Sequence, residues 1–366
     1  MKSSGVNRCS RWLLAFCVLL CSCASARYSA YVVEYRSVDQ NGDSLTLSGK
    51  VTVPRQPAKG VILLPHYTIA AESEAPSNAE KGEQEQLREE YVLIIPDYIG
   101  FGASQDRVHP YLRGDVTARN CVDMLLASGK WKVVGGKMKE DIRIDTIRIV
   151  GFSQGGATAL WCLKLIEEEY SDRIYVKGCY AGSGPHDVAA TYDEAIRTNK
   201  VGLPMVIPML VMGTSEAYGL DLDGNKFFTP QLNDKYDEFI TSKKYSVPQL
   251  FFRTLNHDVS HWLTPYGMDK TEPDTKLLYE HLQRSSLVTE SGEIHCPEWQ
   301  PKAPVYIFHS REDDIVTFLC AEHLQQCWQN VQNVTFDFGD YGNHMDSYNA
   351  FFPRVKERLA EEINKK

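Results

Sequence analysis

The chain has fewer basic than acidic residues and no run of apolar residues long enough to cross a membrane. Its 39 Lys and Arg are outnumbered by 48 Asp and Glu, so the formal net charge is −9. No basic cluster interrupts this excess, and a nucleic-acid partner is not expected, because such affinity comes largely from cations that neutralise phosphates. The apolar run of residues 12–20 is well short of the roughly 20 residues that a spanning helix needs.

The same apolar run has the character of a leader. It follows three basic residues, Lys2, Arg8 and Arg11. A short apolar segment behind positive charges is typical of a signal peptide, which is removed on export. We therefore expect residues 1–26 to be a signal peptide and the protein to be exported from a bacterial cell.

Two cleavage sites are open. Residues 20–23, Leu-Cys-Ser-Cys, resemble a lipobox, which would place the cut near residue 22 and a lipid on Cys23. Residues 24–26, Ala-Ser-Ala, instead fit an ordinary cut near residue 26. The first predicts a periplasmic or outer-membrane lipoprotein tethered through Cys23, and the second predicts a protein free in the periplasm or outside the cell.

Cysteine is sparse after the leader, and no cysteines have the spacing of metal ligands. The thiols at positions 121, 162 and 179 lie in apolar periodic segments and are expected to be packed in the core. Cys320 and Cys327 lie seven residues apart on one predicted helix, roughly 10 Å along its axis, too far to bridge each other. The spacing of His257 and His261 would suit a metal on a helix, but Asp258 is the only close carboxylate, so no metal is expected.

The hydrophobic pattern indicates an α/β protein. Alternating segments at 31–38 and 45–53 flank Asn41-Gly42, which predicts an antiparallel hairpin. Short continuous apolar runs follow, as expected for strands buried on both faces of a mostly parallel central sheet flanked by helices. These runs are residues 60–64, 91–95, 147–150, 174–179 and 305–308.

Ser153 lies on the turn between the predicted strand at 147–150 and a helix that starts near Gly155. Gly151 and Gly155 remove the Cβ atoms that would collide in so tight a turn. Such an elbow exposes the serine hydroxyl and directs the helix N-terminus toward a developing oxyanion. The backbone N–H of Gln154 is therefore a candidate oxyanion donor.

A base and an acid follow in the order that a serine hydrolase of this architecture requires. Asp313 comes after the strand at 305–308, and His344 comes after a strand at 334–338. A serine nucleophile needs a base within hydrogen-bond reach and an acid to orient that base. Ser153, Asp313 and His344 are the predicted catalytic residues, with Asp314 as a competitor for Asp313.

With these motifs the chain resembles the α/β-hydrolase superfamily, and within it exported bacterial secretory lipase- and esterase-like serine hydrolases. The motif-bearing segments are the elbow at 151–155, the oxyanion loop at 66–68, the loop at 96–104, the acid loop at 310–316 and the histidine loop at 342–344. The resemblance implies a second oxyanion donor from Tyr67 or Thr68. Tyr67 stands where the family usually has Gly, Ser310 also replaces Gly, and Thr317 replaces the customary Pro.

The pattern of short apolar runs that predicts strands is interrupted between residues 174–179 and 305–308. We expect the first part of the hydrolase core at 27–187, a helical cap insertion at 188–300 and the end of the core at 301–366. In the predicted cap, Met205, Met209 and Met212 share one helical face and either line an acyl pocket or pack the cap onto the core. In the core, residues 109–112 are expected to be a surface feature beside the pocket, and Asp97 to brace its own loop.

These predictions favour a carboxylic ester hydrolase, esterase- or lipase-like, that needs no metal or cofactor. The substrate would be a small-molecule, lipid or polysaccharide ester. A serine peptidase or an acyltransferase would use the same three residues, and these remain alternatives. A non-catalytic binding module is disfavoured, because binding alone does not require Ser153, Asp313 and His344 in this order.

Overall fold

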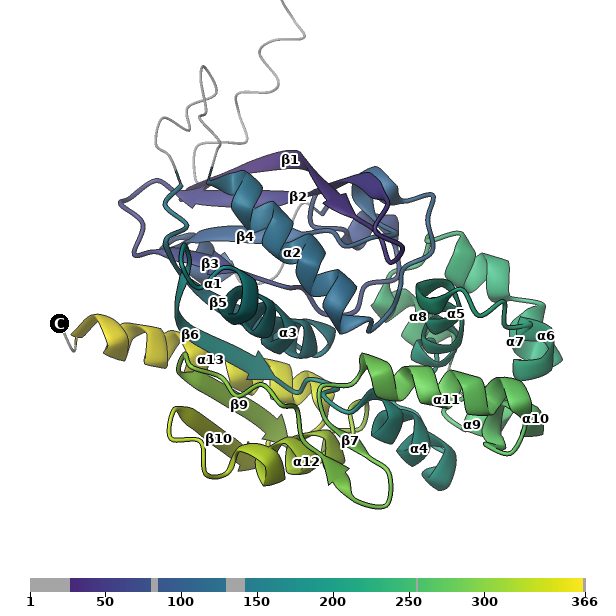
Figure 1. The fold of residues 1–366 in the computed structure, drawn as a ribbon. Helices are drawn as coiled ribbons and strands as arrows, with labels where there is room; N and C mark the ends of the chain where they lie inside the picture. The colour runs from purple at the N-terminus through teal and green to yellow at the C-terminus, as the bar shows by residue number, and fades with distance from the viewer. Residues whose placement is uncertain (1–26, 80–84, 130–141, 255, 365–366) are drawn as a thin grey trace, which may run out of the picture.

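The computed structural model describes residues 27–79, 85–129, 142–254 and 256–364. The predicted leader, with its two cleavage sites and Cys23, lies outside these ranges. The centre of the molecule is an eight-stranded sheet in the order β1-β2-β4-β3-β5-β6-β9-β10 (Figure 1). The strands are β1 (Tyr28–Val38), β2 (Ser44–Pro54), β3 (Val61–Leu63), β4 (Val92–Pro96), β5 (Thr146–Phe152), β6 (Tyr175–Gly182), β9 (Val305–Ser310) and β10 (Val334–Gly339).

Strand directions agree with the predicted architecture. β1 and β2 form an antiparallel hairpin, and β2 pairs antiparallel with β4. All other neighbours in the sheet are parallel, from β4 through β3, β5, β6 and β9 to β10. The carboxyl ends of the parallel strands therefore lie at one edge of the sheet, where α/β proteins bind their ligands.

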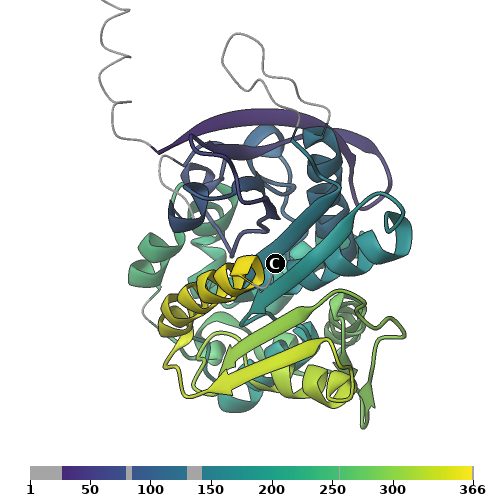
Figure 2. The same ribbon diagram turned by 90° about the vertical axis from the view of Figure 1, so that its left-hand side faces the viewer.

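Helices cover both faces of the sheet. Side chains alternate along a strand, so Leu63 belongs to one hydrophobic cluster and Ile62 to the other. The cluster of Leu63 includes α2 (Gly114–Ser128), α3 (Gln154–Glu169) and α12 (Leu319–Trp328). The cluster of Ile62 includes α1 (Glu85–Arg88) and α13 (His344–Asn364), and Figure 2 shows α13 lying across that face. Burial on both faces explains the continuous apolar runs.

The segment between β6 and β9 is mostly helical and has a hydrophobic cluster of its own, which includes Tyr192, Leu210 and Phe227. This agrees with the helical character predicted for 188–300; a short hairpin, β7 (Thr289–Glu290) and β8 (Ile294–His295), follows the helices. Its helices are α4 (Val188–Thr198), α5 (Val206–Tyr218), α6 (Gly224–Phe227), α7 (Pro230–Asn233), η3 (Asp237–Thr241), α8 (Val247–Arg253), α9 (Val259–Trp262), α10 (Pro265–Met268) and α11 (Pro273–Ser285). None of the helices within the described ranges has the length and apolarity to span a membrane.

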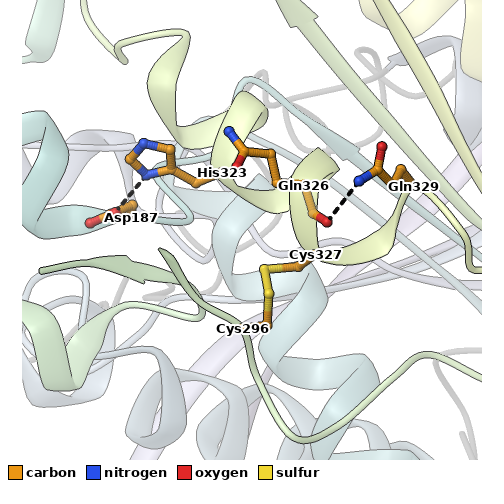
Figure 3. Close-up of a disulfide and its surroundings, with 6 residues drawn as sticks. All are labelled: Asp187, Cys296, His323, Gln326, Cys327 and Gln329. Carbon is orange, nitrogen blue, oxygen red and sulfur yellow. Dashed lines mark hydrogen bonds and ion pairs between the residues drawn. A yellow bond between two sulfur atoms is a disulfide. The ribbon is translucent and has the colours of Figure 1, made fainter. Parts of the chain in front are cut away.

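One disulfide, between Cys296 and Cys327, joins the segment before β9 to the end of α12 (Figure 3). The sequence excluded a bridge between Cys320 and Cys327 but did not identify Cys296 as the partner. The remaining cysteines of the described ranges are buried thiols, as predicted for the first three: Cys121, Cys162, Cys179 and Cys320.

Candidate active site

Ser153 occupies a strained turn between β5 and α3. Its backbone has φ 57° and ψ −125°, a combination that costs free energy for a residue with a side chain. The surrounding glycines permit this close approach. A Cβ on Gly151 would lie 2.0 Å from the carbonyl oxygen of Gly155, and a Cβ on Gly155 would lie 2.2 Å from the carbonyl oxygen of Pro65. The predicted elbow is thus built as the sequence indicated.

His344 lies between Ser153 and Asp313. Its Nε2 is 2.9 Å from the hydroxyl oxygen of Ser153, and its Nδ1 is 2.7 Å from Oδ2 of Asp313. A neutral imidazole with its proton on Nδ1 therefore donates to the carboxylate and accepts from the serine hydroxyl. All three side chains are nearly inaccessible to solvent. In this arrangement the imidazole can accept the proton of the serine hydroxyl, which would activate it as a nucleophile.

The two neighbouring carboxylates play different structural roles. Asp313 faces the imidazole, and its Oδ1 accepts the backbone N–H of Ile315 at 3.0 Å and of Val316 at 2.9 Å. Burial alone would raise the pKa of Asp313, but His344, His309 and the N–H of Val316 together outweigh it, and the pKa lies below its usual value. Asp314 instead accepts the backbone N–H of His344 at 3.1 Å.

Ser310, where the family usually has Gly, connects the acid loop to the histidine loop. Its hydroxyl donates to the carbonyl of Gly342 at 2.7 Å and accepts the N–H of Tyr341 at 3.1 Å. The departure from the family pattern therefore supplies hydrogen bonds that hold the segment preceding His344. It does not displace Asp313 from the imidazole.

The candidate oxyanion donors lie beside the elbow. Gln154 is the first residue of α3, where backbone N–H groups have no acceptor within the helix. The carbonyls of Pro65 and His66 lie against Gly155, so the loop that contains Tyr67 and Thr68 adjoins the start of α3. Thr68 shares a 2.7 Å hydrogen bond with the hydroxyl of Tyr111, whereas the half-buried ring of Tyr67 packs edge-on against Tyr348.

His66 and Asp97 have packing and bracing roles in the structure. The ring of His66 stacks on Tyr98 with centroids 3.9 Å apart, and burial lowers its pKa, which keeps it neutral. The buried carboxylate of Asp97 accepts the hydroxyl of Ser48 at 2.5 Å and the N–H of Ser77 at 2.8 Å. The carboxylate of Asp97 therefore holds segments outside its own loop, and it is linked to that loop through Ser48, whose hydroxyl accepts the N–H of Ala103 at 2.7 Å.

The expectation that residues 109–112 form a surface feature is wrong for the first three of them, since Pro110 is buried with its neighbours and Leu112 is half-buried. His109 and Tyr111 are buried, at 8% and 5% exposure. His109 contacts the side chain of Gln154, and Tyr111 contacts Thr68. Their burial depends on tertiary partners that the local sequence does not reveal.

A cavity of about 230 Å³ adjoins His109 and Tyr111. Met209 and Met212 of α5 line it, together with aromatic, aliphatic and charged side chains, whereas Met205 is buried in a separate cluster. His257, one of the two histidines with helical metal spacing, contacts the carbonyl of Val201 through Nδ1. The described part of the chain contains no group of three or more metal-ligating side chains arranged to hold an ion.

Comparison with known proteins gives a consistent result. The sequence profile of the secretory lipase family matches residues 84–355. A secreted triacylglycerol lipase of Malassezia furfur is 25% identical over 244 residues, which are 66% of this chain and 57% of that protein. The matched region thus spans a little over half the length of this curated relative.

Solved structures share the fold. A putative hydrolase from Legionella pneumophila has a TM-score of 0.74 at 18% identity, covering 91% of this chain and 88% of its own. A variant of the rice cell wall degrading esterase LipA from Xanthomonas oryzae has a TM-score of 0.74 at 21% identity, covering 95% of both chains. Candida antarctica lipase A has a TM-score of 0.63 at 16% identity, covering 87% of this chain and 74% of its own. These likenesses extend over the sheet and the helical segment between β6 and β9.

Proposed function

This chain belongs to the secretory lipase family of α/β-hydrolases, and on that premise we propose that it is an exported serine hydrolase that cleaves carboxylic esters through an acyl-enzyme on Ser153. The observation that carries the proposal is the hydrogen-bonded series from Ser153 through His344 to Asp313 at a nucleophile elbow. Family membership favours esters over the peptide bonds that the same three residues could attack.

In the proposed reaction, His344 removes the hydroxyl proton as the oxygen of Ser153 attacks the ester carbonyl. The carbonyl oxygen becomes an oxyanion, which the backbone N–H of Gln154 and that of Tyr67 or Thr68 stabilise. When the tetrahedral intermediate collapses, His344 gives its proton to the departing alcohol. Water then repeats the sequence on the acyl-enzyme and releases the acid, while Asp313 keeps the imidazole in the required tautomer.

Export is supported by the leader-like residues 1–26 and by the secretory family. We extend the proposal to a bacterial protein that is either anchored through a lipid on Cys23 or released after residue 26. Intact-mass analysis of the mature N-terminus distinguishes them: a diacylated Cys23 indicates the anchored form, and an unmodified Arg27 indicates the free form.

The proposed activity can be tested with p-nitrophenyl esters from acetate to palmitate, for the mature protein and Ser153→Ala. We expect hydrolysis by the wild type and a loss on the order of 10⁵- to 10⁶-fold in kcat for Ser153→Ala, because no other group replaces the nucleophile. A fluorophosphonate should label the wild type and leave Ser153→Ala unlabelled. A folded wild type that neither hydrolyses any ester nor reacts with the probe would contradict the proposal.

A further inference from the structure

One short segment, residues 109–111, contacts both sides of the candidate oxyanion hole. We propose that His109 and Tyr111 are positioning residues, which hold Gln154 and Thr68 at the spacing that the oxyanion requires. This inference rests on the proposed function, since it concerns the same site. It makes Thr68 the residue whose backbone donor Tyr111 holds in place.

His109 fixes the side chain of Gln154. The ring Nε2 lies 2.8 Å from the side-chain nitrogen of Gln154, and the ring Nδ1 lies 2.8 Å from the carbonyl oxygen of Ile99. A carbonyl only accepts and an amide nitrogen only donates, so the proton resides on Nδ1 and Nε2 accepts from Gln154. Burial lowers the pKa of His109 to about 3, which keeps this tautomer neutral at working pH.

Tyr111 fixes the other side. Its hydroxyl lies 2.7 Å from the hydroxyl of Thr68, and both side chains are buried. This interaction orients Thr68 from the side of the loop at 109–111, while the carbonyls of the preceding residues Pro65 and His66 lie against the start of α3. The loop that carries Thr68 is thus held from both directions.

The segment at 109–111 is rigid enough to hold the residues that it contacts in fixed positions. Pro110 has a restricted φ, and the N–H of Tyr111 donates to the carbonyl of His109 at 2.8 Å. The rings of Tyr98 and Phe101 lie 5.9 Å and 5.6 Å from that of His109, which confines the imidazole.

The cap-side helix α5 closes the packing around the segment. A Cβ on Gly213 would lie 2.8 Å from the Cβ of Tyr111 and 3.0 Å from the carbonyl oxygen of His109. No side chain could be accommodated between α5 and this segment without displacing one of them. The two side chains therefore lie in a fixed frame between α5, the loop at Thr68 and the first turn of α3.

The position of the backbone N–H donors matters because the oxyanion hole must fit the transition state more closely than it fits the bound ester. Losing one donor costs about 10²- to 10³-fold in kcat, and a displacement of about 1 Å can cost about 10²-fold. We expect His109→Asn and Tyr111→Phe each to lower kcat for p-nitrophenyl butyrate by about ten- to a hundred-fold, with little change in KM.

Matched variants separate positioning from general packing. The side-chain amide of Asn lies near the position of Nδ1, so His109→Asn keeps the hydrogen bond to the carbonyl of Ile99 and loses the one from Gln154. The longer side chain of His109→Gln reaches the position of Nε2, so this variant should recover most of kcat. His281→Asn is the control for a buried histidine whose Nδ1 also faces a carbonyl, that of Leu277 at 2.8 Å. Tyr192→Phe is the control for a buried hydroxyl, which donates to the carbonyl of Gly267 at 2.6 Å. Both controls should keep the wild-type kcat.

A double-mutant cycle tests the route of action. If His109 acts through Gln154, then Gln154→Leu should lower kcat as much as His109→Asn does, and the double variant should lose no more than either. Additive losses, or wild-type kcat in both His109→Asn and Tyr111→Phe, would overturn the positioning role. Tyr111→Phe removes a single oxygen, so it provides a folded variant even if His109→Asn does not fold. An inactive wild type in the same series would instead overturn the proposed function, and this inference with it.

Discussion

At the scale of single residues, the adjacent carboxylates Asp313 and Asp314 provide the sharpest test of the candidate site. Both reach His344, but Asp313 contacts the ring and Asp314 contacts the backbone N–H. We expect Asp313→Asn to lower kcat on the order of 10⁴-fold, because an amide at this position no longer favours the Nδ1-protonated tautomer. Asp314→Asn retains an oxygen that accepts the backbone N–H and should change kcat little.

The measurement is kcat for p-nitrophenyl butyrate, with thermal unfolding of each variant as the control for folding. Equal losses in the two variants would contradict the assignment of Asp313. A larger loss in Asp314→Asn would mean that the acid loop rearranges in solution.

How far the residues could be predicted depended on whether their role is local. Ser153 was found from neighbours two residues away, because a tight turn imposes glycine on both sides. Asp313 and His344 were found because each follows a strand whose apolar run is visible in sequence. His109 gave no such signal: its partners, Ile99 and Gln154, lie 10 and 45 residues away, and only the folded loop brings them together.

At the scale of elements, α12 is fastened at its middle and near its C-terminal end. Its C-terminal part carries Cys327, bonded to Cys296, and its middle carries His323, which points toward Asp187 (Figure 3). Asp187 also caps α4 by accepting the N–H of Ala190 at 2.9 Å. The beginning and the end of the segment between β6 and β9 are thus both attached to α12.

Removing the disulfide should destabilise the protein without removing its activity. The bridge closes a loop with a sequence separation of 31 residues, for which chain entropy predicts about 3–4 kcal/mol of stabilisation. The double variant Cys296→Ser, Cys327→Ser should unfold at a lower temperature, and dithiothreitol should lower the melting temperature of the wild type by a similar amount. Dithiothreitol should not affect the variant; a further decrease would mean that another disulfide contributes.

The pair of His323 and Asp187 should make stability depend on pH. The hydrogen bond that Nδ1–H of His323 donates to Asp187 at 2.9 Å raises the pKa of His323, and Glu290, 3.6 Å from the other ring nitrogen, adds to this. A folded-state pKa above the unfolded value of about 6.5 stabilises the protein fully below pH 6.5, and this contribution is lost as pH rises through the folded pKa.

His323→Asn keeps a donor near the Nδ1 position but cannot carry a charge. We expect it to lower the melting temperature by several degrees at pH 6 and by less at pH 8. The exposed His295→Asn should show no such difference. A deficit that is the same at both pH values would show that only packing is lost.

Elements were the part of the fold that the sequence predicted best. The parallel strands are buried on both faces, so each appears as a short apolar run, and the hairpin of β1 and β2 alternates across an Asn-Gly turn. The order of strands in the sheet was not predicted, since apolar runs look alike. The pairing of Cys296 with Cys327 was not predicted either, because it depends on where the segment returning to β9 passes α12.

At the scale of the whole molecule, the protein contains several buried imidazoles whose charge burial opposes. Burial lowers the pKa of each, to about 3 for His109 and His186. Below about pH 6.5 these imidazoles bind protons in the unfolded chain but not in the folded chain. The free energy of unfolding must therefore decrease as the pH is lowered below that value. The buried imidazoles with lowered pKa are those of His66, His109, His186 and His309.

His186 isolates this effect, because neither of its ring nitrogens has a hydrogen-bond partner within the described ranges and it is not part of the proposed chemistry. A folded pKa of about 3 against about 6.5 unfolded corresponds to about 2 kcal/mol of stability lost between pH 7 and pH 5. His186→Phe should abolish that loss, so urea unfolding should show a smaller difference between the two pH values. His295→Gln, at an exposed position, should keep the full difference.

Since His323 contributes with the opposite sign, combining His186→Phe with His323→Asn should restore part of the acid sensitivity. An unchanged pH dependence in His186→Phe would mean that this imidazole is protonated within the folded protein.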